Sequence, residues 1–162
     1  MCDAKVVITL RNDAPSSGLP LSIIGSNDQG LPLGTNAMFF SFYTPHLLRE
    51  ASVDGERIPM EVQREGGFRV YSRFLSLAPG QEMIIELQLM GELPAGDDYT
   101  LDIGRQPVVN PDRVSARVEF ERGWNVELVS GEGALSGTQE IQVTQLQTQP
   151  QTLYAKLDEV TY

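Results

Sequence analysis

The amino-acid sequence predicts an all-β protein, an antiparallel immunoglobulin-like β-sandwich of roughly ten short strands. Three observations support this prediction. Apolar and polar residues alternate with a period of two in one segment after another. Turn residues separate these segments at the spacing of about 8–12 residues that sandwiches and barrels show. Apolar residues rarely recur at the spacings of three and four that an amphipathic helix requires.

The N-terminal half contains the first predicted strands. In the segment KVVITLRN, every second residue from Val6 to Leu10 is apolar and falls on one face. Further along, Asp54-Gly55 is a strong signal for a two-residue hairpin turn, because both residues tolerate positive φ. The strand regions up to residue 77 are 5–12, 37–45, 47–63 and 60–77, the last around a turn at Gly66-Gly67.

The segment FLSLAPGQEMIIELQL, residues 74–89, gives the clearest strand signal in the chain. Its second half places four apolar side chains on one face, as a half-buried strand requires. Pro79 sets φ for the first corner of a turn, and Gly80 can adopt φ > 0. We therefore expect a tight turn at Gly80 that joins two adjacent antiparallel strands. The four apolar residues are Met83, Ile85, Leu87 and Leu89.

A long loop rich in glycine and proline, RNDAPSSGLPLSIIGSNDQGLPLGTN, separates the first two strand regions. Its glycine and proline content argues against a helix. We expect at most one short edge strand within it, at Leu21 to Ile24.

The C-terminal half continues the alternation of apolar and polar residues. The Gln/Thr-rich stretch TQEIQVTQLQTQPQT is compatible with a low-complexity linker. We favour strands there, because Ile141, Val143 and Leu146 still mark an apolar edge. The strand regions are 97–107, 113–129 with a turn at Arg122-Gly123, 140–148 and 152–160.

A chain of 162 residues fits one domain. We expect residues 1–4 to be a disordered start or an addition to the natural sequence. Residues 5–130 would form the sandwich, and residues 131–162 would add C-terminal strands packed on the same domain. No internal repeat is present, and the first plausible boundary is the Gly/Ser-rich loop near residue 131.

Charge and cysteine content exclude several classes of protein. Lys and Arg total 12 against 22 Asp and Glu, which gives a net charge of −10. Nucleic acid and anionic membrane surfaces are therefore unlikely partners, since both require basic patches. The negative charge favours solubility, and the alternative is an acidic surface for calcium or a basic partner.

Cys2 is the single cysteine, so no internal disulfide forms. No apolar run is long enough for a membrane span, and the start MCDAKVVITL does not resemble a signal peptide.

The residues that usually carry catalysis or bind metals are scarce. His46 is the only histidine, and no serine lies in a G-x-S-x-G context. We interpret Cys2 as part of a frayed terminus, where a nucleophile would not be held in place. Zinc requires three or four nitrogen or sulfur ligands, which one His and one Cys cannot supply. We therefore predict no catalytic residue, no cofactor-binding residue and no metal ligand.

Acidic pairs are the remaining candidates for chemistry. Oxygen-rich loops could bind calcium if two of them converged, but none has the D-x-D-x-D-G pattern. We interpret these residues as ordinary turn residues and leave calcium binding as an alternative. No spacing supports a glycosidase pair, and GEGALSG lacks the Lys-Ser/Thr of a phosphate-binding loop. The pairs are Asn27-Asp28, Asp97-Asp98 and Asn110 with Asp112.

Aromatic residues could stack on sugar rings. Trp124 is isolated in a strand pattern, so we expect it to be buried in the core. Phe39, Phe40, Phe42 and Tyr43 form a dense cluster in which neighbours must point to opposite faces. We expect the long Gly/Pro loop to cover the outward members, because a bare aromatic patch is a liability.

Several phrases together resemble a known family. They are VVITLRNDAPSSGLP, LPLGTN, FYTP, LAPGQ, YTLDIGRQP, PDRVSARVEF and RGWNV, between about residues 5 and 130. They are similar to the extracytoplasmic C-terminal β-domain of actinobacterial membrane-anchored envelope proteins, a domain-of-unknown-function family. These motifs are turn and core features of moderate specificity. The resemblance implies an external location and a domain cut from a longer chain, and it carries over no catalytic residue.

The sequence thus predicts a non-enzymatic extracytoplasmic module of a larger cell-envelope protein, with a structural or interaction role. Its partners would be the rest of a membrane-anchored chain and, beyond that, another envelope protein or a glycan. The first alternative is a carbohydrate- or protein-recognition module that uses the long Gly/Pro loop or the aromatic cluster. The second alternative is a small hydrolase with carboxylate chemistry. An exposed row of aromatic residues on one sheet would favour recognition, whereas a cleft with two facing carboxylates would favour the enzyme.

Overall fold

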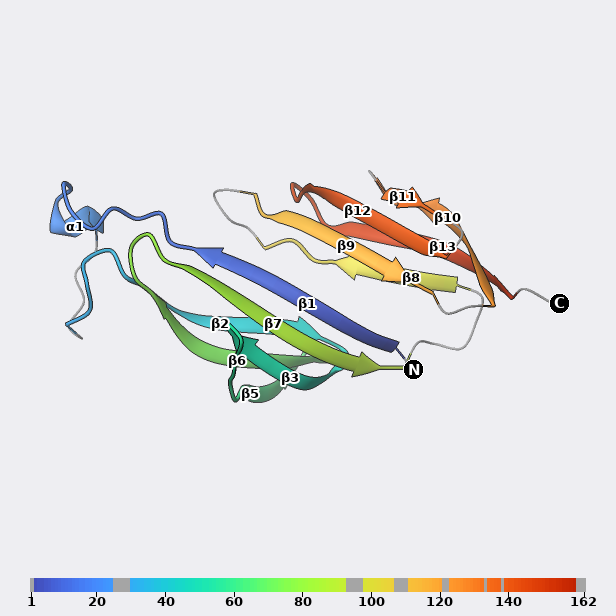
Figure 1. Ribbon diagram of the computed structural model, residues 1–162, viewed down its shortest axis with the longest axis horizontal. Coiled ribbons are helices and arrows are strands. Elements are labelled where there is room, and N and C mark those ends of the chain that lie inside the picture. Colours follow the sequence, from blue (N-terminus) through green and yellow to red (C-terminus); the bar gives the residue numbers. More distant parts are fainter. Residues whose placement is uncertain are drawn as a thin grey trace. The chain divides into compact units, whose positions relative to one another are not determined.

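The computed structural model describes residues 2–24, 30–92, 98–106, 111–120, 123–132, 134–137 and 139–159. These residues form thirteen strands and one short helix, which confirms the all-β class (Figure 1). The chain divides into two compact units, Met1–Leu93 and Pro94–Tyr162. This division differs from the expected single sandwich over residues 5–130, and each unit is described by itself.

Unit 1 contains two antiparallel sheets, each built from strands distant in sequence. Sheet 1 has the order β1-β7-β3-β4, and sheet 2 has the order β2-β6-β5. The strands of sheet 1 are β1 (Cys2–Arg11), β7 (Glu82–Gly91), β3 (Leu47–Val53) and β4 (Glu56–Arg57). The strands of sheet 2 are β2 (Asn36–Thr44), β6 (Phe68–Leu77) and β5 (Glu61–Glu65).

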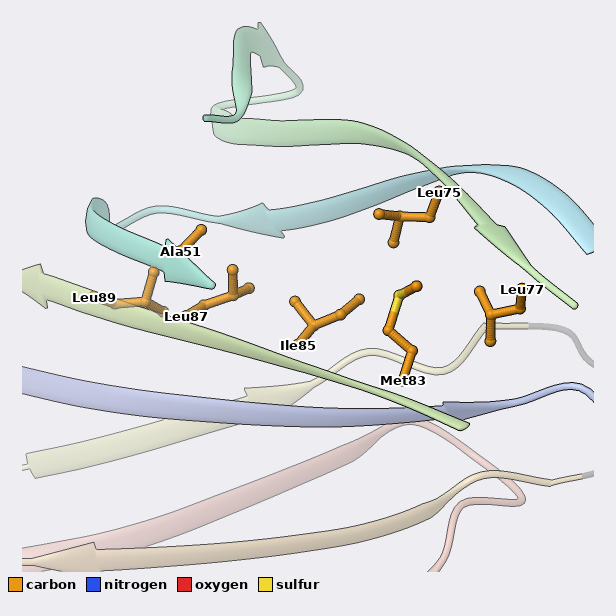
Figure 2. Close-up of a cluster of buried hydrophobic side chains, with 7 residues drawn as sticks. All are labelled: Ala51, Leu75, Leu77, Met83, Ile85, Leu87 and Leu89. Carbon is orange, nitrogen blue, oxygen red and sulfur yellow. The ribbon is translucent and has the colours of Figure 1, made fainter. Parts of the chain in front are cut away.

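The two sheets of unit 1 bury one common hydrophobic core. Figure 2 shows Leu75 and Leu77 of β6 pointing toward the apolar residues of β7. The predicted face of β7 is confirmed, since its four apolar side chains are all buried. Burying a side chain of this size stabilises a protein by about 1.5–3 kcal/mol. The buried core residues are Ala51, Leu75, Leu77, Met83, Ile85, Leu87 and Leu89.

The strand order of unit 1 differs from the expected immunoglobulin-like order. In immunoglobulin sandwiches the first two strands are neighbours in one sheet. Here β1 pairs with β7, the last strand of the unit, and β2 pairs with β6 in the other sheet. This nested pairing resembles that of jelly-roll sandwiches. The immunoglobulin-like order is therefore not confirmed, because period-two patterning defines strands but not their partners.

The turn at Gly80 has the predicted backbone conformation but a different role. Gly80 has φ +74°, and Gln81 N–H donates to Ala78 O at 3.0 Å, as in a tight turn. However, β6 and β7 belong to different sheets, so this turn is a corner between the layers and not a hairpin. Asn12 holds the corner: its backbone N–H donates to Gln81 O (3.0 Å), and its carbonyl accepts from Gly80 N–H (2.8 Å).

The hairpin turns predicted at Asp54-Gly55 and Gly66-Gly67 are confirmed. Asp54 (φ 50°) and Gly55 (φ 84°) form the two-residue turn between β3 and β4. Gly66 (φ 56°) and Gly67 (φ 90°) form the equivalent turn between β5 and β6. Positive φ at both central residues is the type I′ geometry that matches the twist of a hairpin.

Three local predictions for unit 1 are wrong. Residues 2–4 are part of β1 and pair with residues 89–91 of β7, so they are not a disordered start. The segment expected to be an edge strand is the one-turn helix α1 (Leu21–Ile24). It forms because the carbonyl of Pro20 accepts hydrogen bonds from the N–H groups of Ile23 and Ile24. The predicted strand region 47–63 is divided between the sheets: it contains β3 and β4 of sheet 1 and the start of β5 of sheet 2, because the chain crosses between the sheets at residues 58–60.

Unit 2 also contains two antiparallel sheets around one core. Sheet 3 has the order β10-β13-β8, and sheet 4 has the order β11-β12-β9. Ile141 and Val143 of sheet 4 and Leu153 and Ala155 of sheet 3 are buried together. The strands are β8 (Asp98–Ile103), β9 (Arg113–Glu119), β10 (Trp124–Ser130), β11 (Ala134–Ser136), β12 (Glu140–Leu146) and β13 (Gln151–Glu159).

The Gln/Thr-rich tail is therefore a pair of strands and not a linker. β12 pairs with β9, and β13 lies between β10 and β8. Each is the central strand of its sheet. β11 is an additional short strand inside the predicted Gly/Ser-rich loop, which contributes to the excess over ten strands.

Candidate functional site

The outer face of sheet 2 carries four exposed aromatic side chains. The exposed fractions are 60% for Phe39, 52% for Phe74, 51% for Tyr43 and 46% for Phe68. These residues come from β2 and β6, the two long strands of the sheet. The row of exposed aromatic residues is the observation that favours a recognition module.

The alternation along β2 explains why aromatic residues reach this face. Phe40 and Phe42 pack against the core of unit 1, so the residues between and beside them point outward. The expectation that the long Gly/Pro loop covers the outward residues is wrong, because Phe39 and Tyr43 are both more than half exposed. Phe40 and Phe42 supply the inner layer, and Phe39 and Tyr43 supply the outer face.

Phe39 and Phe74 form an aromatic pair across neighbouring strands. They are direct partners in the β2–β6 register. Their ring centroids are 6.3 Å apart with an interplanar angle of 57°. Tilted pairs at this distance are favourable beyond the area they bury. The pair therefore presents a preorganised apolar platform.

Polar groups lie beside the platform on the same face. Ser41 and Ser72 form the next register pair on this face, and their hydroxyl oxygens are 2.9 Å apart. Two residues after Ser41 on β2, Tyr43 OH donates to Glu65 Oε2 at 2.9 Å. The hydrogen bond to Glu65 and the charge of Glu65 raise the pKa of Tyr43 above its ordinary value.

The Tyr43–Glu65 bond also fixes the geometry of the face. Tyr43 is on β2 and Glu65 is on β5, so the bond spans the central strand β6. Val70 of β6 is the register partner of Tyr43 and is only 5% exposed, although it lies on the outer side. Neighbouring side chains on β2 and β5 therefore cover Val70 of β6.

Sheet 1 has an outer face of a different kind. Lys5 Nζ lies 2.9 Å from Glu86 Oε1, and Arg57 forms an ion pair with Glu50. Exposed ion pairs of this type are ordinary on a solvated sheet and contribute about 0.2–1 kcal/mol. In unit 1 the exposed aromatic residues are thus concentrated on one of two outer faces.

His46 and Cys2, the residues considered for nucleophilic catalysis and metal binding, both neighbour Gly91 of β7. The imidazole of His46 lies against Gly91, where an added Cβ would overlap it. The backbone of Cys2 pairs with Gly91 in β1, so the interpretation of a frayed terminus is wrong. Among the described residues, no three His, Cys, Asp or Glu side chains gather at metal-binding distance.

The acidic candidates have structural partners where they are described. Asp98 accepts a hydrogen bond from Tyr154 OH at 2.9 Å, which raises the pKa of Tyr154. The carbonyl of Asp112 accepts from Gln147 N–H at 2.8 Å. The other candidates, Asn27-Asp28, Asp97 and Asn110, lie outside the described residues.

Trp124 is half-buried at the start of the edge strand β10, so the prediction of full core burial is wrong. An edge strand has a neighbour on one side only, and the register partner of Trp124 is the charged residue Glu159. The core of unit 2 is filled by smaller residues of β12 and β13.

Two members of the aromatic face, Phe68 and Phe74, were missed by sequence reasoning. They lie at even positions of β6, where Val70 and Ser72 share the same side. The alternation in FRVYSRFLSL places Phe68 and Phe74 on the same side of β6. It does not show which side of the strand is exposed.

No family model matches this chain, and no curated protein or solved structure matches it either. Within the described ranges, no helix has the length and hydropathy needed to cross a membrane.

Proposed function

We propose that the protein is a non-enzymatic recognition module that binds a neutral glycan on the outer face of sheet 2. The single observation that carries this proposal is the exposed aromatic row of Phe39, Phe74, Tyr43 and Phe68. Large apolar side chains that gather exposed on one face of a sheet often mark a binding surface.

The chemistry of the face matches that of a sugar. One side of a pyranose ring presents C–H groups, which stack on the electron-rich face of an aromatic ring. The ring's hydroxyl groups then need hydrogen-bonding partners at the edges of the contact. The exposed hydroxyl of Ser41 and the Tyr43–Glu65 pair lie on the same face as the Phe39–Phe74 platform and supply such partners. Ser72 is only 6% exposed, and its hydroxyl lies 2.9 Å from that of Ser41.

The charges on this face favour a neutral glycan over an acidic one. The alternation of β5 places Glu61 and Glu65 on the outer side, where they face Ser72 and Phe68 in the register. The outward positions of β2, β5 and β6 include no lysine or arginine. Uronic acids and phosphorylated sugars would meet like charge and no cation.

Affinity electrophoresis tests this proposal. The full-length protein is run in native gels that contain a soluble neutral polysaccharide, such as a glucan, mannan or xylan. We expect at least one of them to retard wild-type protein and to have little effect on the double variant Phe39→Ala/Phe74→Ala. Val7→Ala is the matched control, because Val7 is 54% exposed on a strand of sheet 1.

Two outcomes contradict the proposal. One is that no neutral polysaccharide retards the protein. The other is that light scattering shows a stable dimer that Phe39→Ala/Phe74→Ala dissociates, since the face would then bind a second copy of the chain.

We also propose that this module works outside the cytoplasmic membrane, as part of a larger envelope protein. The support is the resemblance of the turn and core motifs to actinobacterial envelope proteins. Fractionation of the source cells with an antibody against this domain tests the location. Recovery of the protein in the cytosolic fraction alone would contradict it.

A further inference from the structure

A groove opens on the side of unit 1, away from the proposed glycan face. Its volume is about 470 Å³, within the range of about 300–1,000 Å³ typical of small-molecule sites. The apolar residues that line it are Leu48, Ile58, Pro59, Met60, Val62 and Tyr71. Arg49, Glu50 and Arg57 complete its charged rim.

The groove exists because sheet 1 is too short to cover sheet 2 at this edge. β4 has only two residues, and the chain then crosses to sheet 2 and returns as β5. The inner side of β5 is left without an opposing strand. As a result Val62 is 59% exposed, whereas its register partner Tyr71 on the central strand is 4% exposed.

Two arginines lie on the same inner side of sheet 2, beyond the residues that line the groove. Arg64 and Arg69 are direct partners in the β5–β6 register, two residues beyond Val62 and Tyr71. Like charges directly opposite each other destabilise a sheet. The ion pairs in the described part of the chain involve other cations, and neither Arg64 nor Arg69 has an acidic partner there. The Nε of Arg69 is buried and has no hydrogen-bond acceptor within the described residues.

The concentration of cations here is unusual for this chain. Arg49, Arg57, Arg64, Arg69 and Arg73 all line the groove or lie beside it, and Arg73 donates to the lining residue Pro59 at 3.4 Å. These five belong to a chain with only 12 lysines and arginines and a net charge of −10. An apolar floor with unpaired arginines at one end is complementary to a molecule with an apolar chain and an anionic head.

We propose that this groove binds a single-chain anionic amphiphile. The apolar chain lies over Ile58, Met60 and Val62, and the phosphate or carboxylate head accepts hydrogen bonds from Arg64 and Arg69. This second site goes beyond the proposed glycan binding and does not depend on it.

The local hydrogen bonds argue against an added peptide strand as the occupant. A peptide that extended sheet 1 would need the free backbone groups of β3. The hydroxyl of Tyr71 occupies this position: it accepts from Leu48 N–H at 2.9 Å and donates to His46 O at 3.3 Å. A small amphiphile requires none of these backbone groups.

Isothermal titration calorimetry of the full-length protein tests the inference. The ligand is dodecyl phosphate below its critical micelle concentration. Pentaethylene glycol monododecyl ether provides the same chain without charge and without a sugar, and inorganic phosphate provides the anion without a chain. We expect dodecyl phosphate to bind at least about tenfold more tightly than either, because charge-assisted hydrogen bonds and apolar burial both contribute.

The variant Arg64→Gln/Arg69→Gln should weaken dodecyl phosphate binding by about tenfold or more. Its melting temperature without ligand should be unchanged or higher, since the substitutions remove a pair of facing like charges. Loss of binding is then distinguished from loss of folding. Arg113→Gln, on β9 of unit 2, is the matched control and should bind as wild type does.

Three results would overturn the inference. Equal affinity for pentaethylene glycol monododecyl ether would show that the arginines do not take part. Equal affinity for inorganic phosphate would show that the apolar floor does not take part. Unchanged binding by the double arginine variant would place the amphiphile elsewhere.

Discussion

Replacing Asn12 by alanine removes the side chain that joins three segments of unit 1. Asn12 is 7% exposed, and its Nδ2 donates to Gly34 O at 2.8 Å and to Leu77 O at 2.9 Å. Its Oδ1 accepts from Ala14 N–H at 3.1 Å. The side chain therefore ties the end of β1 to the loop before β2 and to the end of β6. The hydrogen bonds to the layer corner at Gly80 come from the backbone of Asn12 and remain in the alanine variant.

The magnitude follows from these three hydrogen bonds. A net contribution of about 1 kcal/mol each, plus the cost of stranded buried carbonyls, gives a loss of about 2–4 kcal/mol for Asn12→Ala. Asn12→Asp keeps the acceptor for Ala14 but turns an oxygen toward two carbonyl oxygens. We therefore expect Asn12→Asp to destabilise unit 1 at least as much as Asn12→Ala.

Urea denaturation followed by circular dichroism measures the loss, and hydrogen exchange mass spectrometry localises it. Peptides from β6 and β7 should lose protection in Asn12→Ala. Asn125→Ala, at an exposed position of β10, is the control and should change stability by less than about 0.5 kcal/mol. A loss below about 0.5 kcal/mol for Asn12→Ala, the level of an ordinary surface substitution, would refute the structural role of Asn12.

Three further predictions concern other parts of the chain. Gly34→Ala should destabilise more than Gly18→Ala in thermal unfolding: both have positive φ, but a Cβ at Gly34 would lie 2.7 Å from a backbone oxygen, whereas Gly18 has open space. Equal effects would contradict the close approach at Gly34. Glu65→Gln should lower the pKa of Tyr43, measured by NMR titration, because Glu65 raises this pKa. The stabilisation from the Tyr43–Glu65 bond is present below the pKa of tyrosine in the unfolded chain, and it is lost as pH rises through the pKa of Tyr43 in the folded protein. An unchanged titration would contradict the bond. Leu153→Ala should cost unit 2 about 2–5 kcal/mol, since Leu153 is 1% exposed; a loss below about 1 kcal/mol would mean that the tail does not form the core.

The strands themselves could be predicted because their signals are local. The four buried residues of β7 follow each other at every second position, and no distant residue is needed to recognise them. The turn residues at Asp54-Gly55 and Gly66-Gly67 are equally local. In each case the backbone conformation is fixed by the residues that adopt it.

Strand partners could not be predicted, because they depend on residues far apart in sequence. Pro79-Gly80 has the same turn chemistry whether the flanking strands pair or lie in opposite sheets. Only the pairing of β1 with β7 and of β2 with β6 makes it a corner. The division at residues 93–94 is similarly hidden, since Pro94 and Gly96 resemble the turn residues found throughout the chain.

Only part of the candidate site could be predicted from the sequence. Alternation required that Phe39 and Phe40 point to opposite faces. It could not show which of them is exposed, or that the long loop leaves Phe39 uncovered. Arg64 and Arg69 appear in the sequence as separate charges, and only the β5–β6 register makes them a pair.

The most direct test of glycan binding is an NMR titration of the full-length protein with the polysaccharide fragment that retards it most. Resonances of the aromatic rings of Phe39, Phe74 and Tyr43 should shift together and saturate at one affinity. Resonances of Val7 and Ile84, exposed on sheet 1, should not shift. Shifts confined to the Gly/Pro loop between residues 12 and 35, or to unit 2, would contradict the assignment of the outer face of sheet 2 as the binding surface.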